Sequence, residues 1–138
     1  MSFLLDTNVV SEVMKAAPDP AVVSWLDQNH ERSFLSSIVV AEIELGIELL
    51  PNGTKKERLQ EALRQFLPLL EERVLAFDLS VARHWAKLCA QLERQGRKTP
   101  VLDSMIEATA LQWNLTIVTR NTSDFIQAQT FNPWSTRL

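Results

Sequence analysis

Four acidic residues, far apart along the chain, stand in or soon after apolar segments, where an unpaired carboxylate is costly to bury. They are Asp6 after segment 3–5, Glu42 within segment 38–43, Asp103 after segment 101–102 and Asp124 soon after segment 115–118. Carboxylate oxygens are the ligands that hard divalent cations prefer. If the fold brings these four side chains together, they form a site for Mg²⁺ or Mn²⁺.

The chemistry that such a site supports is the hydrolysis of phosphodiester bonds. Carboxylates held within a few ångströms of one another repel, and each raises the pKa of its neighbours. A divalent cation reverses this effect, because it keeps the carboxylates ionised and lowers the pKa of water beside it. Attack by that water cleaves a phosphodiester in line with the leaving oxygen. We therefore predict that Asp6, Glu42, Asp103 and Asp124 are catalytic residues.

Two of these acids also have an ordinary structural explanation. An Asp between a strand and a helix, such as Asp6, is a normal N-cap. Asp103 falls in the first turns of an expected helix, where a negative charge interacts favourably with the helix dipole. Glu107 follows at i+4 on the same helix face, and we expect it to be partly exposed. Taken singly, these positions do not distinguish a structural role from a catalytic one.

Glu42 lies on a helix face that the sequence predicts to be buried. At 3.6 residues per turn, Ile38, Leu45 and Leu49 share this face with Glu42. Burial of this apolar face would turn the carboxylate inward, whereas a small rotation of the helix would let it reach water. The spacing alone leaves both interpretations open.

The segment after residues 115–118 is rich in oxygen-bearing side chains, a composition that is also common in turns. Asn121 offers a neutral amide oxygen and Asp124 a charged carboxylate, and the sequence leaves open which of them completes the site. If Asn121 completes the site, the candidate metal ligands are Asp6, Glu42, Asp103 and Asn121. We expect Thr7, Asn8, Ser104 and Thr119 to orient these ligands by hydrogen bonds.

Composition narrows the class of protein. The 138 residues suit a single domain, and 46% hydrophobic with 22% charged residues is typical of soluble globular proteins. One cysteine and two histidines exclude a disulfide within the chain and argue against a zinc site built from Cys or His. A net charge of −3 argues against a surface that attracts nucleic acid everywhere. The start has no basic signal region and no apolar run approaches the ~18 residues of a membrane span, so we expect a cytoplasmic protein with no membrane partner.

Strands and helices are expected to alternate. The predicted strands are segments 2–5, 33–35, 73–77, 115–118 and 130–131, and helices are expected between them. This pattern predicts an α/β fold: one domain over residues 1–138, with a mostly parallel sheet of about five strands flanked by helices. Ligands of such sheets bind beyond the carboxyl ends of the strands. Asp6 and the segment 119–124 both follow strands, and are therefore expected at the same edge of the sheet.

The sequence resembles the PIN-domain nucleases, in particular VapC-type toxins of prokaryotic toxin–antitoxin pairs and their FitB-like branch. Five segments carry the resemblance, in family order and over nearly the full chain: Leu4-Leu5-Asp6-Thr7-Asn8, Ala41-Glu42-Ile43-Glu44-Leu45-Gly46, Asp103-Ser104-Met105-Ile106-Glu107-Ala108, Val118-Thr119-Arg120-Asn121-Thr122 and Phe131-Asn132-Pro133-Trp134. The first and last of these segments are fairly specific when they occur together.

This resemblance implies a Mg²⁺- or Mn²⁺-dependent endoribonuclease that cuts RNA, usually as a homodimer or in a larger complex with its antitoxin. The antitoxin would be a small DNA-binding protein that fills the active site. The family's metal-binding acids correspond to Asp6, Glu42 and Asp103. A fourth acid commonly follows the Thr after the fourth strand, where this chain has Asn121, with Asp124 as the nearest acid.

Two alternatives remain at the level of sequence. Because Asn121 replaces an acid, the chain could be a catalytically degenerate PIN domain that binds RNA or an antitoxin without cutting. A phosphatase with an aspartyl nucleophile at Asp6 is disfavoured, because such enzymes usually carry a second Asp two residues later, where this chain has Asn8.

Overall fold

The computed structural model describes residues 1–134 of the chain, except for the side chain of Glu71. The last four residues of the domain expected over 1–138 lie outside the described residues. Five parallel strands form one sheet in the order β3-β2-β1-β4-β5. They are β1 (Phe3–Leu5), β2 (Ser33–Ser36), β3 (Val74–Leu75), β4 (Thr116–Val118) and β5 (Thr130–Phe131). The α/β class and the five-stranded parallel sheet predicted from the sequence are confirmed.

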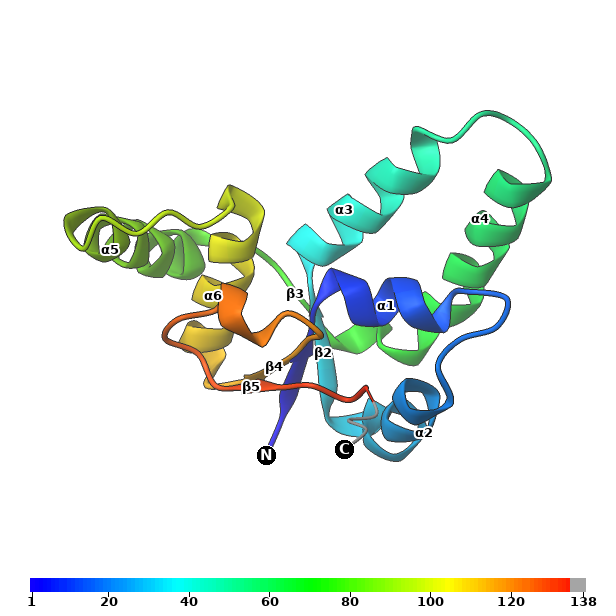
Figure 1. The fold of residues 1–138 in the computed structure, drawn as a ribbon, viewed down its shortest axis with the longest axis horizontal. Helices are drawn as coiled ribbons and strands as arrows, with labels where there is room; N and C mark the ends of the chain where they lie inside the picture. The colour runs from blue at the N-terminus through cyan, green and yellow to red at the C-terminus, as the bar shows by residue number, and fades with distance from the viewer. Residues whose placement is uncertain (135–138) are drawn as a thin grey trace.

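Six α-helices flank this sheet (Figure 1). They are α1 (Thr7–Val13), α2 (Pro20–Asn29), α3 (Ser37–Glu48), α4 (Thr54–Phe66), α5 (Leu79–Arg94) and α6 (Val101–Trp113). Short 3₁₀ turns occur at residues 30–32, 67–69, 71–73 and 122–124. In Figure 1, α5 and α6 lie to the left of the sheet, whereas α1, α2 and α4 lie to its right. Within residues 1–134, none of the helices is both long and apolar enough to span a bilayer.

The core forms where the strands of the sheet meet the helices. Each residue of β1 and β4 is buried, as expected for strands that are covered on both faces. The larger apolar cluster joins these strands to α1, α2, α3, α4 and α6. A smaller one, around Val81, Leu88, Leu92 and Ala108, joins α5 to α6. The sheet is therefore a rigid base for the residues that follow its strands.

Side-chain caps begin four of the helices. Asp6, Asp19 and Ser36 accept hydrogen bonds from backbone N–H groups in the first turns of α1, α2 and α3. Asp78 caps α5, since its carboxylate accepts a hydrogen bond from Val81 N at 3.0 Å. The helix therefore starts at Leu79, directly after its cap.

Candidate active site

An open cavity of about 420 Å³ lies beyond the carboxyl ends of β1 and β4. Its lining residues are Asp6, Thr7, Asn8, Ser11, Glu12, Lys15, Glu42, Asp103, Arg120, Asn121, Asp124 and Trp134. We call this space the acidic cavity. It brings together the four acids predicted to be catalytic, together with Asn121, Thr7 and Asn8. Asp6 follows β1, Thr7 and Asn8 begin α1, Glu42 and Asp103 lie on α3 and α6, and Asn121 and Asp124 follow β4.

Asp6 and Thr119 meet because β1 and β4 are neighbours. Leu5 pairs with Val118 in the parallel register, so that the next residue of each strand arrives at the same edge. Asp6 is only 6% exposed. Its Oδ1 accepts a hydrogen bond from Thr7 N at 2.8 Å, and its Oδ2 accepts one from Thr119 Oγ1 at 2.8 Å. Both carboxylate oxygens are thereby held in place.

Thr119 is the centre of a polar network behind the acidic cavity. Its hydroxyl is fully buried and accepts hydrogen bonds from Asn8 Nδ2 at 3.2 Å and from Asn121 N at 3.0 Å. Asn8 in turn accepts one from Arg120 N at 3.2 Å through its Oδ1. The network ties the start of α1 to the segment after β4. Thr119 and Asn8 thus both contact Asp6 or its neighbours by hydrogen bonds, and their role in orienting a metal ligand stays a prediction.

Glu42 lines the cavity from α3. The prediction of which face of this helix is buried was wrong. Thr7 Oγ1 donates a hydrogen bond to Glu42 Oε1 at 2.9 Å. The buried residues of α3 are Val39, Ile43 and Ile47, whereas Leu45 and Leu49 are 59% and 76% exposed. The helix is rotated because its β-branched face packs into the larger apolar cluster, which includes residues of α1, α4 and α6. Glu42 therefore lies half-buried at the border between core and cavity.

Asp103 occupies the first turn of α6 and is half-buried. Its pKa is raised from 3.8 to about 6, first by burial and then by the negative charges of Asp6, Asp124 and Glu42. The four acids therefore share one electrostatic environment. Burial also raises the pKa of Asp6, with a contribution from Asp124, while the hydrogen bonds from Thr119 and Thr7 oppose this rise.

Two residues of α6 lie elsewhere than expected. Ser104 does not line the acidic cavity: its hydroxyl donates to Val101 O at 2.6 Å and accepts from Trp85 Nε1 at 2.9 Å, so it points toward α5. The Ser104 hydroxyl therefore makes no hydrogen bond to any of the predicted metal ligands. Glu107 is 1% exposed rather than partly exposed. Its Oε2 accepts from the backbone N–H groups of Gln127 and Ala128, which holds the segment before β5.

Sequence reasoning missed part of the cavity wall. Glu12 is buried and accepts hydrogen bonds from Lys15 Nζ and Asp19 N, both at 2.9 Å. The bond from Lys15 is the main cause of its lowered pKa. Ser11, Glu12 and Lys15 follow Asn8 by three, four and seven residues. This is the spacing of one helix face, so the periodicity of α1 was a signal that could have identified them.

The donor set suits a hard divalent cation. It comprises the carboxylates of Asp6, Glu42, Asp103 and Asp124 and the amide oxygen of Asn121, without sulfur or imidazole. Within residues 1–134, however, no three Asp, Glu, His or Cys side chains form a group that could hold a metal ion as they stand. The pKa of Asp103 is raised by burial and by the neighbouring carboxylates, which repel one another until a cation compensates them. The residues fit the ion by chemistry, and the carboxylates would have to close around it.

The fold and the acidic cavity define an α/β domain with an oxygen-rich site at the carboxyl edge of a parallel sheet. Residues 3–129 match the PIN domain family, and the chain belongs to this family. It is 45% identical to Toxin FitB of Neisseria gonorrhoeae, over 95% of this chain and 97% of that protein. It is 42% identical to VapC ribonuclease Y4jK of Sinorhizobium fredii, over 95% and 96% of the two chains.

A solved structure has the same fold over nearly the whole chain. The structure of FitAB bound to the IR36 DNA fragment matches with a TM-score of 0.88 at 41% identity, and covers 99% of this chain and 98% of that one. The resemblance to VapC-type and FitB-like toxins that the sequence motifs predicted is confirmed.

Proposed function

We propose that this protein is a metal-dependent endoribonuclease toxin that hydrolyses RNA phosphodiester bonds and is inhibited by a cognate antitoxin. One observation carries the proposal: Asp6, Glu42, Asp103 and Asp124, which come from four separate segments, line a single cavity. The raised pKa of Asp103 is additional support, since the charges of the other three contribute to it after burial. Carboxylates that gather in an open cavity and perturb one another's pKa are typical of functional sites.

The relatives support both parts of this proposal. One relative, at 42% identity, is named a VapC ribonuclease, and another, at 45% identity, is named Toxin FitB. The similar solved structure is of FitAB on DNA. For this chain we infer RNA as the substrate and a small DNA-binding antitoxin as the partner. RNA as a substrate also implies action in the cytoplasm.

The mechanism assigns a task to each side chain. Asp6, Glu42 and Asp103, completed by Asn121 or Asp124, would hold Mg²⁺ or Mn²⁺, and the bound ion would supply a more acidic water and a positive charge for the phosphate oxygens. The hydrogen bonds from Thr119 and Thr7 orient the carboxylates of Asp6 and Glu42. Asp124 lines the cavity from an exposed turn, where its carboxylate can accept the proton that the attacking water loses.

We also propose that the protein forms a homodimer. Leu45 and Leu49 on α3 and Val101 at the start of α6 are between 59% and 76% exposed. Exposed apolar side chains mark an interaction surface where they form one contiguous patch, and we propose that these residues contribute to such a patch. The mass of the purified protein, measured by light scattering, tests this assembly. A monomer at all concentrations would contradict it.

The nuclease proposal is tested with purified protein that is free of antitoxin. We expect cleavage of RNA with Mn²⁺, and we expect Asp6→Asn and Asp103→Asn each to lower the rate by at least about a hundredfold. Asp27→Asn, on the exposed face of α2, is the control and should leave cleavage unchanged. Induced expression should inhibit growth for the wild-type chain and not for the two cavity variants.

A degenerate PIN domain that binds without cutting remains the second candidate. Two observations favour it: Asn121 occupies the position of a common fourth acid, and the acids do not form a ready-made metal group among the described residues. RNA binding without turnover in the same assay would support this second candidate and contradict the first.

A further inference from the structure

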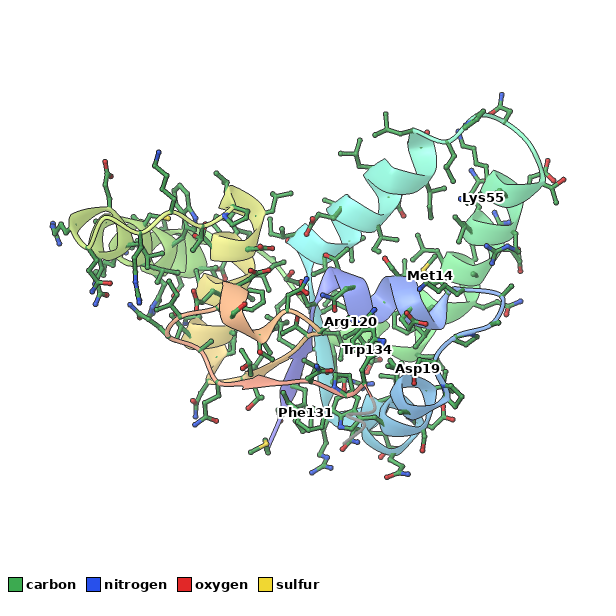
Figure 2. All side chains as sticks on the ribbon, in the orientation of Figure 1. Met14, Asp19, Lys55, Arg120, Phe131 and Trp134 are labelled. Carbon is green, nitrogen blue, oxygen red and sulfur yellow. The ribbon has the colours of Figure 1, made fainter. Side chains whose placement is uncertain are left out.

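Arg120 and Trp134 form a pair at the rim of the acidic cavity (Figure 2). The Arg120 guanidinium carbon lies 5.3 Å from the centre of the Trp134 ring, so the cation lies over the aromatic face. The two residues are 14 positions apart, and both line the cavity. The backbone N–H of Arg120 donates to Asn8 Oδ1, which anchors its backbone to the network behind Asp6.

Arg120 differs from the other cation of this wall. Lys15 donates to Glu12 Oε1 at 2.9 Å, and this ion pair occupies its charge. Within residues 1–134, Arg120 forms no salt bridge, although five acids line the same cavity. Its side chain is exposed and rests on an indole ring. After the hydrogen bond from Lys15, the charge of Arg120 also contributes to the lowered pKa of Glu12 without direct ion pairing, so the guanidinium N–H donors are available to a ligand.

A polyanion that approaches this cavity meets repulsion from its carboxylates. A cation at the rim offsets this repulsion and gives the polyanion a fixed point of contact. Arg suits this task, since its planar fork of N–H donors matches a phosphate group in a bidentate manner. Because the guanidinium already rests on Trp134, less conformational entropy is lost when it binds. An aromatic side chain beside it also offers a surface on which a base of a single strand can stack.

We propose that Arg120, held over Trp134, binds a backbone phosphate of single-stranded RNA and positions the strand for the carboxylates of the acidic cavity. Arg120 is thus a positioning residue for the substrate. This inference rests on the nuclease function proposed above, but it concerns binding, which can be measured separately from cleavage.

The experiment uses the full chain with Asp103→Asn, so that RNA is not consumed. The probe is a short fluorescein-labelled single-stranded RNA of mixed sequence, titrated in Mg²⁺ over a series of salt concentrations. Arg120→Ala should bind about tenfold more weakly, and its log–log salt slope should be shallower by about 0.7, the value of one phosphate contact on a single strand. Arg120→Lys should restore the slope and only part of the affinity.

Arg64→Ala is the matched control. It removes the same charge, but Arg64 lies on α4, pairs with Glu61 at 2.8 Å and does not line the acidic cavity. We expect parental affinity and slope from this variant. Trp134→Leu should weaken binding more than Trp134→Phe, because only Phe keeps an aromatic face. Thermal melts verify that each variant is folded.

Cleavage by chains that retain Asp103 gives a second measurement. In that background, Arg120→Ala should raise KM and leave kcat within about twofold, as expected when an interaction with the bound substrate is lost. Equal affinity and equal salt slope for Arg120→Ala and Arg64→Ala, with a parent that cleaves RNA, would overturn this inference alone. A parent that neither binds nor cleaves RNA would overturn the proposed function as well. A loss of antitoxin binding by Arg120→Ala, with RNA binding intact, would assign Arg120 to the protein partner and overturn the inference.

Discussion

The carboxyl group of Asp103 has acid–base chemistry that its surroundings change. Burial raises the pKa of this group most, and the charges of Asp6, Asp124 and Glu42 raise it further.

Asp6 has a structural role that is compatible with the catalytic role proposed for it. Its Oδ1 caps α1 through Thr7 N, whereas its Oδ2 faces Thr119 at the cavity. An N-cap and a metal ligand are thus compatible in one side chain, because a carboxylate has two oxygens.

The pKa of Asp103 predicts how the stability of the metal-free protein depends on pH. The group titrates near 3.8 in the unfolded chain and at about 6 in the folded protein. Between these values the folded state binds more protons, so the free energy of unfolding falls as pH rises and the loss is complete above about 6. Because the side chain is partly exposed to solvent, we expect a loss on the order of 1 kcal/mol.

Urea unfolding in EDTA, over a pH series that extends beyond this window, measures the effect. Asp103→Asn should remove most of it, whereas Asp27→Asn on α2 should retain it. If the free energy of unfolding of the wild type and of Asp103→Asn changed equally with pH through this window, Asp103 would be ionised without penalty.

At the scale of the element, caps position the side chains of the site. Ser36 accepts from Val39 N at 3.1 Å and so starts α3, the helix that carries Glu42. Asp78 starts α5 in the same way. These caps follow strands or turns directly, so the helices begin at defined points relative to the sheet. The rotation of a helix is a separate matter, since it depends on which face finds a neighbour.

The cap of α5 can be assigned by mutation. Asp78→Ala should lower the free energy of unfolding by about 1 kcal/mol, because it leaves the N–H of Val81 without its acceptor. Ser80→Ala is the control and should change stability by less than about 0.5 kcal/mol, since Ser80 is exposed in the first turn. Urea denaturation measures both. A larger loss of stability from Ser80→Ala than from Asp78→Ala would contradict this cap assignment.

At the scale of the whole molecule, the site exists only where several elements meet. β1 and β4 are separated by 110 residues and are direct neighbours in the sheet. Asp6 follows the first, Thr119 follows the second, and α3 and α6 add Glu42 and Asp103. A cation bound by these carboxylates would therefore join segments that only the folded state holds together.

This arrangement predicts that the metal ion stabilises the fold. At a concentration of about a hundred times its Kd, a ligand of the folded state alone raises the free energy of unfolding by about 2.7 kcal/mol. We expect Mg²⁺ or Mn²⁺ to raise the Tm of the wild-type chain, and to raise that of Asp103→Asn much less. Asp27→Asn should respond as the wild type does. An equal rise in Tm for all three chains would indicate non-specific ion effects and no shared site.

The local part of this structure could be predicted from the sequence. Strands were recognisable as short apolar segments, and helix starts as Asp, Ser or Pro at the right positions, because capping and periodicity are short-range effects. Alternation of strands and helices then implied a parallel sheet, and with it a site at its carboxyl edge. This reasoning was enough to place Asp6 and the segment 119–124 at one edge of the sheet, whereas Glu42 and Asp103 were assigned to the same site through the resemblance to PIN-domain nucleases.

Tertiary packing decided what those short-range effects left free. The β-branched face of α3 packs inward and leaves Leu45 and Leu49 exposed. Ser104 turns toward Trp85, and Arg120 comes to rest on Trp134. Each outcome depends on a neighbour distant in sequence, and the choice between helix faces is settled by the total area and the hydrogen bonds that packing gains. The sequence by itself determined which elements form and where polar groups follow them, whereas their packing decided which of those groups face the acidic cavity.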